Sequence, residues 1–219
     1  MISVVIPTHN DQESLTRCFD SLIGATVHGV VREVIVADRG SSDDTLMIAD
    51  AAGAHVVQSG KARADQLTAG AKAARAEWIL FLNPETALDP GWDVEAEAFM
   101  ERATLDRPRA AAFRFGLDDF EAVSRRTETM VALRCWLFKL PYGDQGLLIP
   151  KRMYNKLGGH RDVAMEDVDL VRRIGARRLV MLRARAVNKA ETRPRAWRNM
   201  ALTALHALRF PAGMLARLG

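Results

Sequence analysis

Short stretches of buried, β-branched residues alternate with helical patterns along the first half of the chain. The strand-like runs are Ile2–Ile6, Val34–Ala37, His55–Gln58 and Trp78–Leu82. The helical patterns between them are Ser14–Ile23, Thr45–Ala52 and about 64–75. Strands that alternate with helices are typical of βαβ units and a parallel sheet. The order of elements therefore predicts an α/β fold with a mostly parallel, Rossmann-like sheet flanked by helices.

The second half of the chain is less regular. Helical patterns occur at Trp92–Arg102, Glu121–Leu140, Lys151–Leu157 and Asp167–Ile174, and short strand patterns at Ala110–Phe115, Gly146–Ile149 and Leu179–Leu182. Arg195–Arg209 is predicted to be an amphipathic helix, because its apolar residues fall on one stripe. We expect one domain over residues 1–190, followed by a basic amphipathic helical tail over 191–219.

Composition places the chain among ordinary globular proteins. It has 219 residues, of which 48% are hydrophobic and 26% charged, which excludes disordered and disulfide-rich classes. Its two cysteines, Cys18 and Cys135, have no CxxC spacing and are expected to be reduced thiols. Pro7 interrupts the first apolar run, so no signal peptide is expected, and no run approaches the ~20 apolar residues of a spanning helix. These features predict a cytoplasmic protein.

Positive charge is concentrated at the C-terminal end. Residues 177–219 hold ten Arg or Lys and one acid, Glu191, so the first 176 residues are mildly acidic within a net charge of +4. This asymmetry is unlike that of a uniformly basic nucleic-acid binder, and no nucleic-acid partner is expected. A basic amphipathic tail is able to lie on an anionic membrane surface, at the inner face of the cell membrane, or to pack on the sheet.

Ligands of open α/β sheets bind at the carboxyl ends of the strands, where this chain carries polar residues. The first strand ends in Pro7-Thr8-His9-Asn10, which is neither a dinucleotide fingerprint nor a P-loop. This turn either holds a base or ribose edge or simply caps the next helix. The second strand ends in Asp38, before the turn residue Gly40, and a carboxylate there is able to accept hydrogen bonds from a ribose or a base.

Two further segments carry carboxylates. Asn83-Pro84-Glu85 follows the fourth strand, and residues i and i+2 of an extended segment share a face, which suits a hard cation such as Mg²⁺. The alternative is a proline turn with an exposed Glu. Glu166 and Asp167 open a helix, where acids either favour the helix dipole or serve as a general base for a sugar hydroxyl.

In their order and spacing, these segments resemble the bacterial family 2 glycosyltransferases of the GT-A fold, of the small stand-alone type, from Ile2 to about Ile174. The two closest matches are Val4-Val5-Ile6-Pro7-Thr8-His9-Asn10 and the stretch from Val34 to Thr45, with its Asp38-Arg39-Gly40-Ser41-Ser42-Asp43 turn. The resemblance implies that Pro7, Thr8, Asn10 and Asp38 line the pocket of a sugar-nucleotide donor.

The metal motif of that family, Asp-x-Asp, is replaced here by Asn83-Pro84-Glu85. Glu85 still supplies one carboxylate, whereas the neutral Asn83 weakens metal affinity. We therefore expect weak, donor-dependent binding of Mg²⁺ or Mn²⁺. The stretch from Gly60 to Gln66 resembles a Gly-basic-Ala-x-Gln pattern of small members, which implies that Lys61 or Arg63 faces the diphosphate.

The remaining matches concern the acceptor side. Tyr142-Gly143-Asp144-Gln145-Gly146 resembles the acceptor segment of the small members, which implicates Asp144 and Gln145. Gly158-Gly159-His160 followed by Glu166-Asp167 resembles the Gly-Gly and Glu-Asp motifs of the family. The resemblance gives Asp167 the role of catalytic base, with Glu166 beside it, whereas His160 shows no metal-ligand spacing and is expected to be an ordinary residue.

The function expected from the resemblance is sugar transfer from a nucleoside-diphosphate sugar to an acceptor hydroxyl. A hexosyl- or deoxyhexosyltransferase that inverts the anomeric centre is expected, acting on a glycan or lipid-linked acceptor of the cell envelope. One alternative is a catalytically silent sugar-nucleotide-binding or membrane-surface protein of the same fold. The other is a nucleotidyltransferase, which the turn after the first strand disfavours because it lacks a Gly-rich basic loop.

Overall fold

A computed structural model describes residues 1–103, 108–119, 121–138, 141 and 143–189 of the chain. Tyr142 and the tail expected at residues 191–219 lie outside the described residues, so the tail helix stays a prediction. Among the described residues, no helix is both long enough and apolar enough to cross a bilayer.

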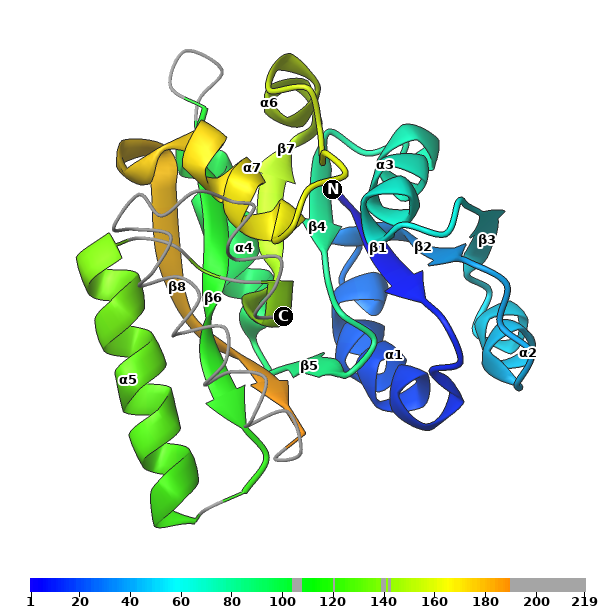
Figure 1. Cartoon of the computed structure of the whole chain (residues 1–219), viewed down its shortest axis with the longest axis horizontal. Helices are drawn as coiled ribbons and strands as arrows, with labels where there is room; N and C mark the ends of the chain where they lie inside the picture. Colours follow the sequence, from blue (N-terminus) through cyan, green and yellow to red (C-terminus); the bar gives the residue numbers. More distant parts are fainter. Residues whose placement is uncertain (104–107, 120, 139–140, 142, 190–219) are drawn as a thin grey trace.

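The described strands form one eight-stranded sheet of order β3-β2-β1-β4-β7-β6-β8-β5 (Figure 1). The strands are β1 (Ile2–Thr8), β2 (Val31–Asp38), β3 (His55–Gln58), β4 (Trp78–Phe81), β5 (Thr86–Leu88), β6 (Ala110–Leu117), β7 (Leu147–Pro150) and β8 (Leu179–Asn188). The helices are α1 (Gln12–Val27), α2 (Thr45–Ala51), α3 (Arg63–Ala73), α4 (Trp92–Arg102), α5 (Ala122–Phe138), α6 (Lys151–Lys156) and α7 (Glu166–Ile174), with short 3-10 turns η1 (Gly143–Gln145) and η2 (Ala176–Arg178).

The half of the sheet from β3 to β4 is parallel, as the alternation of elements predicts. β1 pairs in parallel with both β2 and β4, and β2 pairs in parallel with β3. Their carboxyl ends therefore meet at one edge, where Thr8 and Asp38 are register partners. β7 then pairs antiparallel with both β4 and β6, and joins this half to the second one.

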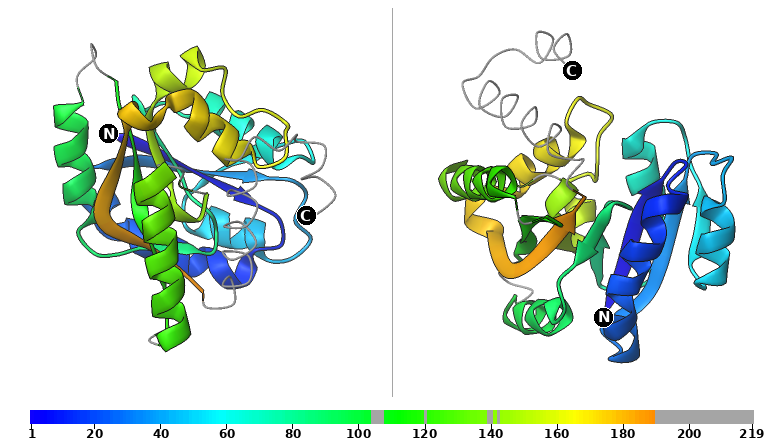
Figure 2. Two further views of the ribbon diagram at one scale, coloured as in Figure 1. Left: turned by 60° about the vertical axis from the view of Figure 1, so that its left-hand side comes forward. Right: turned by 90° about the horizontal axis from the view of Figure 1, so that it is seen from below.

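Helices cover both faces of the sheet, and each face has its own apolar cluster. Val4 and Ile6 of β1 pack in one cluster with Leu15 of α1 and Trp92 of α4. Val5 points to the other face, which α3, α6 and α7 cover. Figure 2 shows α1 and α4 on the side of the sheet opposite α7. Strands buried on both faces explain why the first strands read as unbroken apolar runs.

The sequence underestimates two strands in the second half. β8 was expected at Leu179–Leu182 but continues to Asn188, because Ala184 and Ala186 face inward while Arg183 and Arg185 are exposed. This alternation is typical of a half-buried strand, but the two arginines interrupt the apolar run by which a strand is recognised in the sequence. β5 was not expected at all, since three residues carry no periodic signal, and its antiparallel pairing with β8 creates it.

Candidate active site

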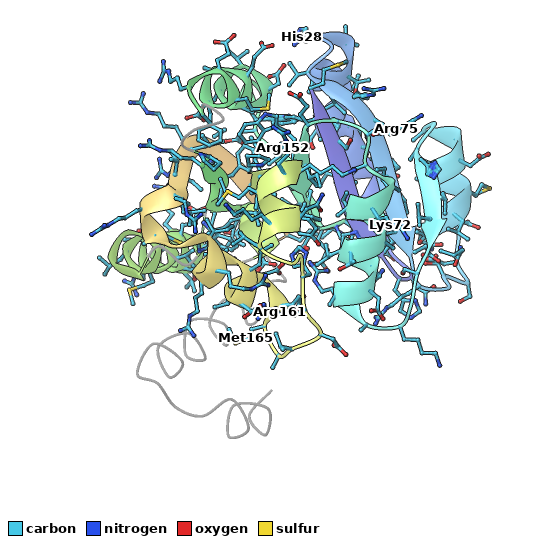
Figure 3. The ribbon with its side chains drawn as sticks, turned by 90° about the horizontal axis from the view of Figure 1, so that it is seen from above. His28, Lys72, Arg75, Arg152, Arg161 and Met165 are labelled. Carbon is cyan, nitrogen blue, oxygen red and sulfur yellow. The ribbon has the colours of Figure 1, made fainter. Side chains whose placement is uncertain are left out.

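A cavity of about 460 Å³ opens at the carboxyl edge of the parallel strands. Its walls come from six segments far apart in the chain: the turns after β1 and β2, the start of α3, the loop after β4, η1 and the start of α7. Met165, labelled in Figure 3 beside Arg161 in the loop that leads to α7, also lines it. The fold thus gathers at one place the polar segments that the sequence singled out.

The Asp38 carboxylate holds together the two turns beside this cavity, those that follow β1 and β2. Its carboxylate accepts hydrogen bonds from the Thr8 hydroxyl at 3.0 Å and from the backbone amides of Gly40 at 2.7 Å and Ser41 at 2.9 Å. The Ser41 hydroxyl donates to it as well. The side chain is buried and does not line the cavity. Gly40, at φ +91°, adopts the left-handed conformation that lets the turn fold back onto the carboxylate.

These hydrogen bonds set the charge state of Asp38. Burial alone would raise its pKa, but the donors from Ser41, Gly40 and Thr8 outweigh burial and lower the pKa below its ordinary value. A carboxylate with a lowered folded pKa stabilises the fold above its unfolded pKa of about 3.9, and this stabilisation is lost as the pH falls through the folded pKa. Asp38 is therefore ionised at neutral pH and holds the turns together.

We expect Asp38→Asn to lower the free energy of unfolding by about 1–3 kcal/mol at pH 7, because a neutral amide loses the charge that strengthens the hydrogen bonds from Gly40, Ser41 and Thr8. The difference from the wild type should stay constant down to about pH 5 and shrink below about pH 4. Urea unfolding at a series of pH values measures it. Asp44→Asn is the control, since Asp44 is exposed and makes no capping hydrogen bond with its side chain. A loss that does not depend on pH would contradict this role.

Gln66 closes the gap between the ends of β1 and β2. Its side-chain amide donates to the carbonyl oxygens of Thr8 and Ala37, both at 2.8 Å. The residue is only 3% exposed, yet it lines the cavity. With both N–H groups used, the oxygen is the polar atom that Gln66 has left to offer a ligand.

Arg63 connects three of the cavity walls. Its Nε lies 2.9 Å from Glu166 Oε1, and its Nη2 lies 3.9 Å from Asp167 Oδ2. Nη2 also donates a hydrogen bond to the side-chain oxygen of Asn83. The first residue of α3 thereby places a permanent positive charge at the centre of the cavity, between the loop after β4 and the start of α7.

Asn83 continues this network toward η1. Its side-chain amide donates to Asp144 Oδ1 at 2.9 Å. The backbone oxygen of Asp144 in turn accepts from the buried amide of Asn188, at 2.9 Å, at the end of β8. Gln145, next to Asp144, is buried and donates to the carbonyl of Phe113 at 3.0 Å. Asp144 thus faces the cavity while Gln145 anchors η1 to β6.

Glu166 and Asp167 have opposite pKa shifts although they are neighbours. Burial and the charge of Asp167 raise the pKa of Glu166, and the cation of Arg63 offsets this only in part. Burial also acts to raise the pKa of Asp167, but His160 and Arg63 outweigh it and lower that pKa. Asp167 therefore holds its negative charge at neutral pH, as a general base must.

Gly143 allows η1 to approach the carboxylate of Asp167 closely. A Cβ atom at position 143 would lie far inside the contact distance of Asp167 Oδ2 and 3.3 Å from Arg63 Nη2. The backbone amide of Gly143 is among the groups that stabilise the charge of Asp167. Any side chain here would push the carboxylate away from its position.

The match of the chain to known families decides its classification. The family described as "Glycosyl transferase family 2" matches residues 3–155, which is more than half of the chain. The chain belongs to glycosyl transferase family 2. Its fold is accordingly the GT-A fold, with a curled, mostly parallel sheet between helices, as the sequence predicts.

Solved structures with the same fold include other family 2 glycosyltransferases. TarS of S. aureus (residues 1–349) superposes with a TM-score of 0.66 at 16% identity, over 99% of this chain and 68% of TarS. Glucosyl-3-phosphoglycerate synthase of Mycobacterium tuberculosis, in complex with Mn²⁺ and UDP-glucose, superposes with a TM-score of 0.66 at 20% identity, over 96% of this chain and 80% of the synthase.

In sequence, the same M. tuberculosis synthase is 48% identical to this chain over 56 residues, which is 26% of this chain and 17% of the synthase. The alignment thus spans about a sixth of that curated relative.

Most of the predicted site residues of this family 2 protein lie together. The cavity is lined by Pro7, Thr8, Arg63, Asn83, Glu85, Asp144, Glu166 and Asp167. Four other predicted residues do not line it. Asp38 and Gln145 are buried behind its walls, Lys61 is exposed, and Asn10 uses its side chain to accept a hydrogen bond from the Ser42 amide at 2.8 Å.

Sequence reasoning missed several cavity residues. Arg39 lines the cavity, held by a hydrogen bond to the carbonyl of Lys61, and so does Asp11 at the start of α1. Gln66 was noticed only as part of a pattern. The signal that would have found Arg39 is its place directly after Asp38 at the end of a parallel strand.

The residues after β4 fit a divalent metal in part. Glu85 lines the cavity, and its negative charge adds to burial, which is the main cause of the raised pKa of Asp11. The oxygen of Asn83, by contrast, already accepts from the Arg63 cation, which repels a metal there. Among the described residues, no three His, Cys, Asp or Glu side chains gather into a metal cluster. Glu85 would therefore hold the ion, with phosphate oxygens completing its shell.

Proposed function

We propose that this protein transfers a sugar from a nucleoside-diphosphate sugar to an acceptor hydroxyl. The observation that carries the proposal is the placement of a fixed cation, Arg63, and an ionised base, Asp167, in one cavity at the carboxyl edge of the sheet. A uridine diphosphate donor is the first choice, because the solved relatives are complexes with UDP-glucose and with UDP-GlcNAc.

The reaction is a single displacement at the anomeric carbon. The acceptor oxygen forms its bond to this carbon while the bond from the carbon to the diphosphate oxygen breaks. Asp167 takes the proton of the hydroxyl, and the electron pair leaves with the nucleoside diphosphate, whose growing charge Arg63 stabilises. A displacement of this kind inverts the anomeric configuration. Glu85 would hold a divalent metal, which would supply further positive charge to the diphosphate when bound.

The nucleotide is proposed to lie against the turns after β1 and β2. Pro7 and Thr8 line the cavity there, beside Gln66 and Arg39. Asn10 and Asp38 contribute by fixing the shape of these turns, and Lys61 by anchoring Arg39. Asp144 faces the same cavity from η1 and is proposed to bind the acceptor, with Gln145 holding η1 in place.

A lipid-linked or cell-envelope glycan is the proposed acceptor class, supported by the basic amphipathic pattern of residues 193–219. Co-sedimentation with anionic vesicles, comparing the full chain with a chain ending at Glu191, tests this part. Salt-sensitive binding that is lost on truncation supports it, and equal, negligible binding of both chains rejects it.

The test of the main proposal is a screen of nucleoside-diphosphate sugars. A specific donor stabilises the folded protein by mass action, so one nucleotide sugar should raise the melting temperature above the others. Release of the nucleoside diphosphate, measured with that donor and a panel of hydroxyl acceptors, then shows transfer. Nucleotide binding without turnover against all acceptors would favour the silent binding protein, for which the neutral Asn83 is the supporting observation.

We expect the metal to bind only when the diphosphate is present. Mn²⁺ titrated by calorimetry should bind weakly to the protein alone and more tightly with UDP, and Glu85→Gln should weaken binding by about tenfold, or ~1.4 kcal/mol. Glu77→Gln is the matched control, because Glu77 is exposed and does not line the cavity. Equal Mn²⁺ affinity of Glu85→Gln and the wild type would contradict the role of Glu85. Full turnover in excess chelator would show that Arg63 stabilises the leaving diphosphate without a metal.

A further inference from the structure

His160 carries a buried ring nitrogen that no hydrogen bond explains. Its side chain has no exposed surface, and Nε2 has no hydrogen-bond partner within the described ranges. The nearest carboxylate oxygen is Oδ1 of Asp167, 3.5 Å away, at the outer limit of hydrogen bonding. A buried polar atom without a partner is rare and calls for a physical explanation.

Tyr154 of α6 is the hydrogen-bond partner of the other ring nitrogen of His160. The Tyr154 hydroxyl accepts a hydrogen bond from the backbone amide of His160 at 3.1 Å. The same hydroxyl lies 3.0 Å from Nδ1, and the Thr68 side chain is its other hydrogen-bonding neighbour. When the hydroxyl donates to Nδ1, the neutral ring carries its hydrogen on Nε2. That N–H faces Asp167.

The chain around His160 leaves the ring little freedom. Gly158 and Gly159 have φ of +79° and +65°, in the left-handed region, and a Cβ atom on Gly159 would lie 3.1 Å from the Tyr154 hydroxyl. The glycine pair therefore lets the loop wrap tightly around the tyrosine. Phe81 of β4 meets the imidazole edge-on, with ring centres 4.8 Å apart. The ring is thus held from two sides, with one nitrogen toward Tyr154 and the other toward Asp167.

We propose that His160 is a positioning residue for the base Asp167: its Nε2–H holds Oδ1, and Tyr154 fixes the tautomer that makes this possible. The base role of Asp167 rests on the proposed function. When the acceptor enters the cavity, this contact tightens and keeps the carboxylate in one orientation, turned toward the incoming hydroxyl. Without an acceptor in the cavity, the Nε2–H of His160 has no closer partner than Asp167 Oδ1, at 3.5 Å.

Other charged groups and one backbone amide also face Asp167, and they remain when His160 is changed. Arg63 approaches from α3, Glu166 is the neighbour on α7, and the amide of Gly143 approaches from η1. Loss of the Nε2–H alone should then raise the pKa of Asp167, so the base would become protonated at a higher pH than in the wild type.

Three variants separate this role from packing. His160→Phe keeps an aromatic ring and loses the donor, His160→Gln keeps an N–H of similar reach, and Tyr154→Phe removes only the hydroxyl. We expect His160→Phe to lower kcat by about 10- to 100-fold with a small change in donor KM, and to move the acidic limb of the pH profile upward. His160→Gln should recover part of both, and Tyr154→Phe should show a smaller loss. A folded His160→Phe with the wild-type kcat and pH profile would overturn the proposal.

A second measurement does not depend on activity. Long-range ¹H–¹⁵N correlation spectra of the histidine-labelled full chain report the tautomer of each ring. We expect His160 in the Nε2–H form in the wild type, and a mixture of tautomers in Tyr154→Phe. The Nδ1–H form in the wild type would overturn the proposal even where His160 variants fold poorly. If the wild type shows the expected tautomer but transfers no sugar, the proposed function fails, whereas the proposed arrangement of Tyr154, His160 and Asp167 is still supported.

Discussion

Asp167→Asn should lower kcat by about 10²- to 10⁴-fold, the usual cost of losing a general base. The amide has the size of the carboxylate but takes up no proton, so the acceptor hydroxyl stays a weak nucleophile. Steady-state kinetics with the donor identified by the screen, together with the melting temperature of the variant, measures this.

The matched control for this variant is Asp169→Asn. Asp169 lies in the first turn of the same helix but pairs with Arg173, at 2.6 Å, and does not line the cavity. Its replacement should leave kcat nearly unchanged. Near-wild-type turnover of Asp167→Asn would move the base role to Asp144 or Glu166, the other carboxylates on the acceptor side of the cavity.

Arg63→Met should lower kcat by about 10²- to 10³-fold, a loss comparable to the removal of one fixed donor from a developing negative charge. The variant keeps the long apolar stem but removes the cation that faces the leaving diphosphate. It also removes the positive charge that lowers the pKa values of Glu166 and Asp167, so the acidic limb of the pH profile should move upward. Affinity for the nucleoside diphosphate product should fall with it.

Two further variants make this result specific. Arg63→Lys keeps the charge and loses the fork that reaches Glu166 and Asn83 at once, so it should recover only part of kcat. Arg75→Met removes an arginine that pairs with Glu33 at the other end of α3, and it should have no effect on kcat. Equal kcat of Arg63→Met and the wild type, with Mn²⁺ present or absent, would show that the leaving group is stabilised elsewhere.

Site residues that lie at strand ends or helix starts could be predicted from the sequence. The parallel half of the sheet follows from the apolar runs at β1, β2 and β4, and the segments that end these strands meet because parallel strands end at one edge. Arg63, Asn83, Glu85 and Asp167 were placed in one cavity by this rule and the family resemblance together. Asn83 and Glu85 lie in the segment that follows a strand, and Arg63 and Asp167 lie at a helix start.

Contacts that arise only from the packing of distant segments could not be predicted from the sequence. His160 reads as an ordinary histidine, because its partners Tyr154 and Asp167 lie on two different helices and only the folded loop brings them together. Gly143 reads as a turn residue, whereas its role is to leave room for a carboxylate. Asp38 was expected to contact the donor directly, and no sequence signal shows that two turns already use its hydrogen-bonding capacity.

The antiparallel strand β7 divides the chain into a donor side and an acceptor side. The residues proposed to face the nucleotide and its diphosphate, from Pro7 and Thr8 to Arg63 and Glu85, precede β7 in the chain, while the base lies after it on α7. Only the short η1 turn adds acceptor-side groups just before the strand. The acceptor side is therefore separable along the chain: exchanging the segment from η1 onward should change which molecule receives the sugar and leave the donor-binding residues in place. A chimera joined ahead of η1 tests this.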